Sequence, residues 1–217
     1  MRAFAPLTMV LTLIAGLLLV PSTSVAAAKK KKKSPTAIEA TGGASFGQDN
    51  PEFTQTVPGT EAVLLDSGLA AAPADAPKAV QQAVWTANEI IGKPYIYGGG
   101  HASFRARGYD CSGTVSYALH GGDLLDSPLD SSSFMKWGAA GEGEWITVYT
   151  NPGHAFAVIA GLRLDTSAAG DPSGAKGPRW RPALRSTKGF KARHPKEDPD
   201  FGAAPAAVTA GGGATAK

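Results

Sequence analysis

The 217-residue sequence is poor in cysteine and in charge. Its one cysteine, Cys111, excludes a disulfide within the chain and a zinc site built on several cysteines. Charged residues make up 18% of the chain and the formal net charge is +3, which is too small to indicate a nucleic-acid partner. The sequence also lacks a Gly-rich phosphate-binding motif and a cluster with metal-ligand spacing. We therefore expect no metal, no cofactor and no nucleic acid.

The N-terminus has the features of a secretory signal peptide. Arg2 precedes an apolar run from Leu7 to Val20, and the small residues of 22–28 (STSVAAA) offer a cleavage site. The run is short for a membrane span, which needs about 20 residues. We expect residues 1–28 to be removed and the mature protein to be exported. The alternative is an uncleaved anchor.

Composition divides the remaining chain into a linker, a domain and a tail. Five consecutive lysines are followed by residues 34–76, which are rich in Ala, Gly and Pro, so 29–76 is predicted to be a disordered linker. The Ala- and Gly-rich residues 196–217 are predicted to be a disordered tail, which leaves 77–195 as one domain. The lysine run is either a solubilising spacer or a site attracted to anionic polymers or lipid headgroups. It consists of Lys29, Lys30, Lys31, Lys32 and Lys33.

Hydrophobic periodicity changes from helical to alternating along this domain. A spacing of three and four residues predicts helices at 77–91, 111–120 and 131–137. Alternation then predicts strands at 145–149, 154–160 and 162–166, with a further short strand at 179–181. Gly161 is expected to form a tight turn between two of the strands. Helices followed by strands indicate an α+β domain with an antiparallel sheet.

The lone cysteine stands in a context that favours reactivity. Asp110-Cys111-Ser112-Gly113 follows a glycine-rich stretch and begins a predicted helix. Free N–H groups and the helix dipole at such a position stabilise negative charge, which lowers the pKa of a thiol. The small neighbours leave the sulfur accessible. The alternative is a small buried hydrophobic residue without a chemical role.

A thiolate nucleophile needs a base, and the base needs a group that orients it. His154 begins the clearest strand, and a turn at Gly161 brings Asp165 back beside it. The Asp165 carboxylate could accept the Nδ1 proton of the imidazole, or it could be a solvated residue at a strand end. Thr166 is expected on the opposite face of the strand, and an error of one residue in the register would exchange the two.

Three segments together resemble the NlpC/P60 cysteine peptidases. They are Gly92-Lys93-Pro94-Tyr95-Ile96-Tyr97-Gly98-Gly99, Gly108-Tyr109-Asp110-Cys111-Ser112-Gly113 and Gly153-His154-Ala155-Phe156-Ala157-Val158. The resemblance covers about residues 80–167 and implies a papain-like α+β fold. Members of this family mostly cut the peptide stems of bacterial peptidoglycan. The sequence departs from the family pattern at Asp165, where His, Asn or Gln is usual, and at Tyr97, where Trp is usual.

The resemblance assigns roles to individual residues. It implies that Cys111 is the nucleophile, that His154 is the base and that Asp165 orients the histidine. It also places Tyr95 beside the nucleophile. We expect Tyr95, Asp110 and Ser112 to bind substrate.

A basic segment follows the region of resemblance. Residues 176–193 contain seven Lys and Arg residues and no acidic residue. Alternation predicts that Arg179 and Arg181 share one face of a short strand, where they could bind carboxylates of the substrate. The alternative is a solvated basic edge.

These observations predict a secreted or wall-associated monomeric cysteine endopeptidase that acts on peptidoglycan peptide stems. Two alternatives remain open at this point. One is an amidase or acyltransferase with the same thiol chemistry, and the other is an inactive module that binds the cell wall.

Overall fold

The computed structural model describes residues 50–196. The predicted signal peptide (1–28), the lysine run, residues 34–49 of the predicted linker and residues 197–217 of the predicted tail lie outside the described residues. Between residues 50 and 196, no helix has both the length and the apolar character that crossing a bilayer requires.

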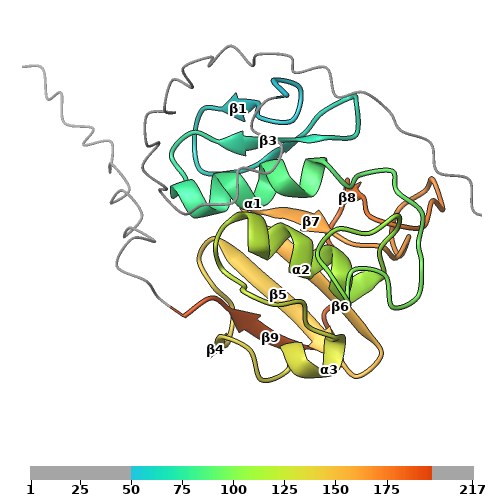
Figure 1. Ribbon diagram of the computed structural model, residues 1–217. Coiled ribbons are helices and arrows are strands. Elements are labelled where there is room, and N and C mark those ends of the chain that lie inside the picture. The colour runs from blue at the N-terminus through green and yellow to red at the C-terminus, as the bar shows by residue number, and fades with distance from the viewer. Residues whose placement is uncertain (1–49, 197–217) are drawn as a thin grey trace, which may run out of the picture. The chain divides into compact units, whose positions relative to one another are not determined.

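The larger of two sheets has six antiparallel strands in the order β4-β9-β5-β6-β7-β8 (Figure 1). The strands are β4 (Ala139–Ala140), β5 (Ile146–Asn151), β6 (His154–Ile159), β7 (Leu162–Leu164), β8 (Trp180–Arg181) and β9 (Lys191–His194). The helices are α1 (Lys78–Asn88), α2 (Cys111–Gly121) and the short α3 (Ser131–Phe134). Helices α1 and α2 pack on each other, and α2 packs on β6. The predicted α+β fold with N-terminal helices on an antiparallel sheet is confirmed.

A second, small sheet covers the other side of α1 (Figure 1). Its strands are β1 (Thr56–Val57), β2 (Val63–Leu64) and the central β3 (Ala70–Pro73). The prediction of a disordered linker is therefore wrong for residues 50–76, and the domain begins before residue 77. Small side chains let the β3 backbone approach α1 closely, so Ala70, Ala71 and Ala72 are buried although each adds little apolar area.

Asn88 on α1 binds both this sheet and the larger one. Its Oδ1 accepts hydrogen bonds from the Ala70 N–H at 2.9 Å and from Trp180 Nε1 at 2.8 Å. Its Nδ2 donates to the carbonyl oxygens of Ala70 and Phe53, both at 2.9 Å. One buried amide thus satisfies polar groups from three separate segments, as burial requires.

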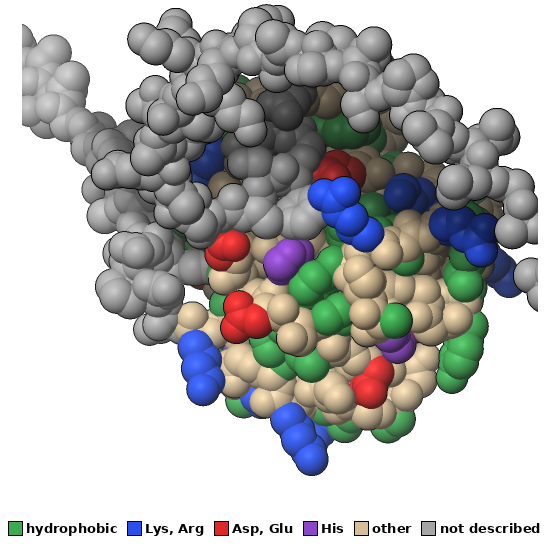
Figure 2. All heavy atoms as spheres, viewed as in Figure 1, with side chains coloured by type: hydrophobic (Ala, Val, Ile, Leu, Met, Phe, Trp, Pro, Cys, Tyr) green, Lys and Arg blue, Asp and Glu red, His purple; other side chains and the backbone are tan. Residues whose placement is uncertain are grey.

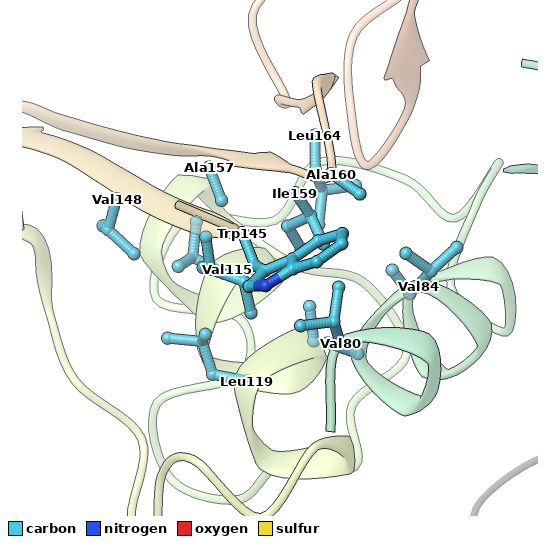
Figure 3. Packing of buried hydrophobic residues seen from close by; sticks show 14 of the residues in the cluster. Val80, Val84, Val115, Leu119, Trp145, Val148, Ala157, Ile159, Ala160 and Leu164 are labelled. Carbon is cyan, nitrogen blue, oxygen red and sulfur yellow. The ribbon is translucent and has the colours of Figure 1, made fainter. Parts of the chain in front are cut away.

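The hydrophobic core lies between the helices and one face of the larger sheet (Figure 3). Val80 and Val84 of α1 meet Val115 and Leu119 of α2, and the sheet closes the cluster from the opposite side. The sheet contributes Trp145, Val148, Ala157, Ile159, Ala160 and Leu164. This packing fixes α2, and therefore its first residue Cys111, against β6.

The sequence predicts most elements but not all of their limits. The first helix ends at Asn88 rather than at residue 91, and α3 ends at Phe134 rather than at 137. The predicted turn is formed by Ala160 and Gly161, whose φ angles of 46° and 82° suit the tight turn of a hairpin. Strand β9 is not predicted, and it lies between β4 and β5.

Candidate active site

Cys111 is the first residue of α2, and Asp110 caps the helix. Asp110 Oδ1 accepts a hydrogen bond from the Gly113 N–H at 2.8 Å, which is the usual N-cap arrangement. A Cβ at Gly113 would collide with the Gly99 carbonyl oxygen, so glycine allows the preceding loop to pass close to the helix start. The sequence thus places Cys111 where helix N–H groups favour a negative charge.

His154 and Asp165 are brought together by the β6–β7 hairpin. His154 begins β6, and its N–H donates to Asn151 Oδ1 at 2.9 Å in the preceding turn. Asp165 follows the last residue of β7, and its Oδ1 lies 2.9 Å from His154 Nε2. The expected contact of Nδ1 with the carboxylate is wrong. Nε2 faces the carboxylate instead, so Nδ1 lies on the side of the ring away from Asp165.

The structure also pairs His154 with Cys111. Burial by itself would raise the pKa of the Cys111 thiol, but the hydrogen bond with His154 and the N–H of Ala155 lower the pKa below its ordinary value. Burial by itself would lower the pKa of His154, but the hydrogen bonds with Asp165 and Cys111 raise this pKa to about 9. Both directions favour a thiolate beside an imidazolium.

Asp165 is held as a carboxylate by groups on both of its oxygens. Its side chain is fully buried, and burial would raise its pKa. Hydrogen bonds outweigh burial and lower the pKa, first that from His154 and then that from the Ser167 N–H, which lies 2.8 Å from Oδ1. Arg185 Nη1 donates to Oδ2 at 3.2 Å. The carboxylate is therefore charged and fixed in orientation.

Tyr95 lies near the nucleophile and is accessible. It is 44% exposed and forms an isolated bridge with Tyr109, the residue before Asp110. Partial burial raises the pKa of its hydroxyl, and the nearby charges of Cys111 and Asp110 raise it further. The structure thus brings Tyr95 to the position that the sequence predicts.

Asp110 and Ser112 form hydrogen bonds within the protein. Both are buried, and Ser112 Oγ donates to Asp110 Oδ1 at 3.2 Å. His101 Nε2 lies 3.0 Å from Asp110 Oδ1 and 3.0 Å from Ser112 Oγ, and the Gly98 N–H donates to Asp110 Oδ2 at 3.0 Å. These polar atoms hold the loop 98–101 against the start of α2, and substrate binding by the two side chains stays a prediction.

Arg181 is a structural residue. It is fully buried, where its Nε donates to the Asp165 carbonyl oxygen at 3.0 Å and its Nη1 donates to Asp171 Oδ2 at 2.5 Å. Further bonds reach the carbonyl oxygens of Ala175 and Gly177. The prediction that Arg181 binds substrate is wrong, because a cation in this segment is needed to satisfy the loop that follows β7.

Arg179 is half-buried, and its Nη1 donates to the Pro178 carbonyl oxygen at 2.8 Å. The basic segment as a whole does not form one charged face. Arg193 donates to the carbonyl oxygens of Trp137 and Gly138, whereas Lys176, Lys188 and Lys191 are exposed. On the face of the molecule in Figure 2, some Lys and Arg side chains stand apart at the lower left, whereas others lie nearer one another at the upper right.

Two contributors to the site have no signal in the sequence. Arg185 and Phe190 belong to the irregular segment between β8 and β9, where neither period is present. Their position depends on the pairing of β9 with β5, which the sequence does not indicate. Within residues 50–196, no group of three or more His, Cys, Asp or Glu side chains is arranged to hold a metal ion.

Solved structures that are similar to this chain include two from Mycobacterium tuberculosis. One is the peptidoglycan hydrolase RipB (Rv1478) from Mycobacterium tuberculosis, with 21% identity and a TM-score of 0.42 over 56% of this chain and 66% of that structure. The other is Rv1477, a hypothetical invasion protein of the same organism, with 21% identity and a TM-score of 0.41 over 56% of this chain and 64% of that structure. The chain thus spans slightly less than two thirds of the length of either structure. No protein-family model and no curated protein matches the sequence.

Proposed function

We propose that this protein is a cysteine peptidase of the NlpC/P60 type that hydrolyses amide bonds in the peptide stems of peptidoglycan. One observation carries the proposal: Cys111 at a helix start contacts His154, which in turn contacts the buried carboxylate of Asp165. A nucleophile, a base and an orienting group in this order are what acyl transfer through a thiol requires. The resemblance of the flanking motifs supports the choice of substrate.

The reaction follows from the charge state of the pair. The Cys111 thiolate attacks the amide carbonyl carbon, and the carbonyl electrons move to the oxygen. The imidazolium of His154 then gives its proton to the leaving amine, and the C–N bond breaks to leave a thioester on Cys111. Neutral His154 next takes a proton from water, which attacks the thioester and releases the acid. Asp165 keeps the ring in place throughout, because its Oδ1 accepts the hydrogen bond that His154 Nε2–H donates.

Backbone donors and Tyr95 complete the arrangement. The Cys111 N–H is at the first position of α2, where a helix offers no internal carbonyl acceptor, so it can stabilise the oxyanion. Tyr95 presents an accessible hydroxyl on the neighbouring loop. We assign it to substrate binding.

The substrate implies the place of action. A peptidase of peptidoglycan acts outside the cytoplasmic membrane, so export by the N-terminal segment and association with the cell wall belong to the proposal. Electrostatic contact of Lys29–Lys33 with anionic wall polymers is a further part of it.

Digestion of purified peptidoglycan tests the proposed function. Soluble fragments released by the mature protein are identified by mass spectrometry, and the Cys111→Ser variant is the matched control. New free amino and carboxyl ends within the peptide stems, absent with the variant, are expected. Cleavage at the junction of glycan and peptide would indicate an amidase, and new amide bonds to an added amine would indicate a transferase. Binding to the wall without any cleavage would indicate an inactive module.

A further inference from the structure

Arg185 reaches the pair of His154 and Asp165 from a part of the chain that carries none of the recognised motifs. Its Nη1 donates to Asp165 Oδ2 at 3.2 Å, on the opposite oxygen from the one that faces His154. Arg163 is nearer along the chain, but its Nε lies 3.8 Å from Oδ2, beyond hydrogen-bond range. Arg185 therefore supplies the bond to Oδ2 that Arg163 does not make.

Two aromatic rings hold the guanidinium in place. The Arg185 Cζ lies 5.2 Å from the centroid of the Phe156 ring and 5.4 Å from that of the Phe190 ring. The two rings meet edge to face, with centroids 5.2 Å apart. Phe190 also lies edge to face with the His154 ring, at 6.2 Å. Arg185, Phe156 and Phe190 thus form one packed unit around the His154–Asp165 contact, which we call the Arg185 clamp.

We propose that Arg185 is a positioning residue for the reaction, which fixes the Asp165 carboxylate and offsets its negative charge so that His154 can release its proton. The inference rests on the proposed function, because it concerns how readily the imidazolium acts as an acid. A buried carboxylate without a counter-charge would hold the imidazolium proton more strongly. A cation on the far oxygen weakens that hold without breaking the hydrogen bond.

Other charged and titratable groups also lie around this site. Charged or titratable groups approach from α2, from the loop before it, from β7 with its following loop, and from β8. They are Cys111, Asp110, Tyr95, Arg163, Asp171 and Arg181. Arg181 binds the Asp165 backbone oxygen instead of the carboxylate, and Arg163 has buried nitrogens without hydrogen-bond partners. Unlike Arg163 and Arg181, Arg185 donates a hydrogen bond to the carboxylate and is partly exposed, at 20% of its side chain.

The test is an NMR titration of the His154 ring in the full-length protein labelled at histidine. The His154 signal is assigned by its loss in a His154→Gln variant. In Arg185→Met, we expect the pKa of His154 to rise by about half a pH unit or more, because a nearby cation has been removed. Arg185→Lys should stay close to the unchanged protein, because the charge is kept. Lys188→Met removes one charge from an exposed side chain of the same segment and should leave the His154 pKa unchanged.

An unchanged or lower pKa of His154 in Arg185→Met would overturn the proposal, as would an equal rise in Lys188→Met. Folding of each variant is checked by its amide spectrum. If Arg185→Met does not fold, Arg185→Gln keeps a donor without the charge and is interpreted in the same way. The titration follows the imidazole and not cleavage. Its failure therefore leaves the proposed hydrolysis intact, and inactivity toward peptidoglycan would leave the titration result standing.

Discussion

His154 and Asp165 are hydrogen-bonded although they are not directly opposite each other in the sheet. The β6–β7 ladder pairs Ala157 with Leu164, so Asp165 continues the register opposite Phe156, two residues beyond His154. Residues two apart share a face, and a diagonal pair is within reach of side chains as long as these. The contact of 2.9 Å between Nε2 and Oδ1 therefore follows from the turn at Ala160–Gly161.

The ionisation of Cys111 should be visible in its reactivity. We expect alkylation of the thiol by iodoacetamide to proceed readily below the ordinary thiol pKa, because the contact with His154 lowers it. In His154→Ala, the rate profile should move to higher pH, because the imidazolium is gone. The measurement is the rate of mass increase against pH, with Cys111→Ser as the unreactive control. Identical profiles for the unchanged protein and His154→Ala would contradict the pairing.

Asp165→Asn tests the orienting group. The amide keeps the size of the side chain and some hydrogen bonding but cannot stabilise the imidazolium, so we expect kcat to fall by more than about tenfold. Thr166→Val is the matched control, because Thr166 is the next residue along the chain and is also buried. The measurement is steady-state kinetics on a soluble muropeptide. A larger loss in Thr166→Val than in Asp165→Asn would show that the wrong residue has been assigned.

The pH dependence of hydrolysis should have an alkaline limit set by His154. The pKa of His154 is raised to about 9, so the imidazolium persists through neutral pH and is lost as the pH rises through this value. Activity should therefore decline above about pH 9. In Asp165→Asn, the decline should begin at lower pH, because the hydrogen bond and charge that raise the pKa are weakened. A rate profile of kcat/KM against pH for both proteins measures this shift, and an alkaline limb that stays in place would contradict the assignment.

The sequence predicts the nucleophile and its base because their signals are local. A capping aspartate before Cys111 and an alternating strand after His154 are patterns of a few residues. Residues 50–76 could not be predicted in this way, because alanine contributes little apolar area and its burial in β3 depends on the close approach of α1. The Asn88 side chain that satisfies this strand looks, in sequence, like any helix-end asparagine.

The arginines of the basic segment illustrate the same limit. Arg179, Arg181 and Arg185 have the same chemistry and lie close together in the sequence, yet they face different surroundings. One is half-buried, one is a fully buried structural residue, and one binds the Asp165 carboxylate. These surroundings are set by the long-range pairings of β7 with β8 and of β5 with β9. Local charge patterning contains no information about either pairing.

Substitution of Arg181 should consequently lower stability, whereas substitution of Arg179 should weaken substrate binding. Arg181→Ala leaves the Asp171 carboxylate and three carbonyl oxygens without their donor, so we expect the melting temperature to fall by on the order of 10 °C. Arg179→Ala should leave the melting temperature almost unchanged.

Gly177, two residues before Arg179, packs on the loop that contains Tyr95, so this arginine stands beside the substrate-binding loop. We therefore expect Arg179→Ala to raise KM more than it lowers kcat, and added salt to reduce the difference, since exposed charges are screened beyond about 8–10 Å. Thermal unfolding and muropeptide kinetics at low and high salt measure the two effects. A stable Arg181→Ala variant with a raised KM would instead show that Arg181 binds substrate.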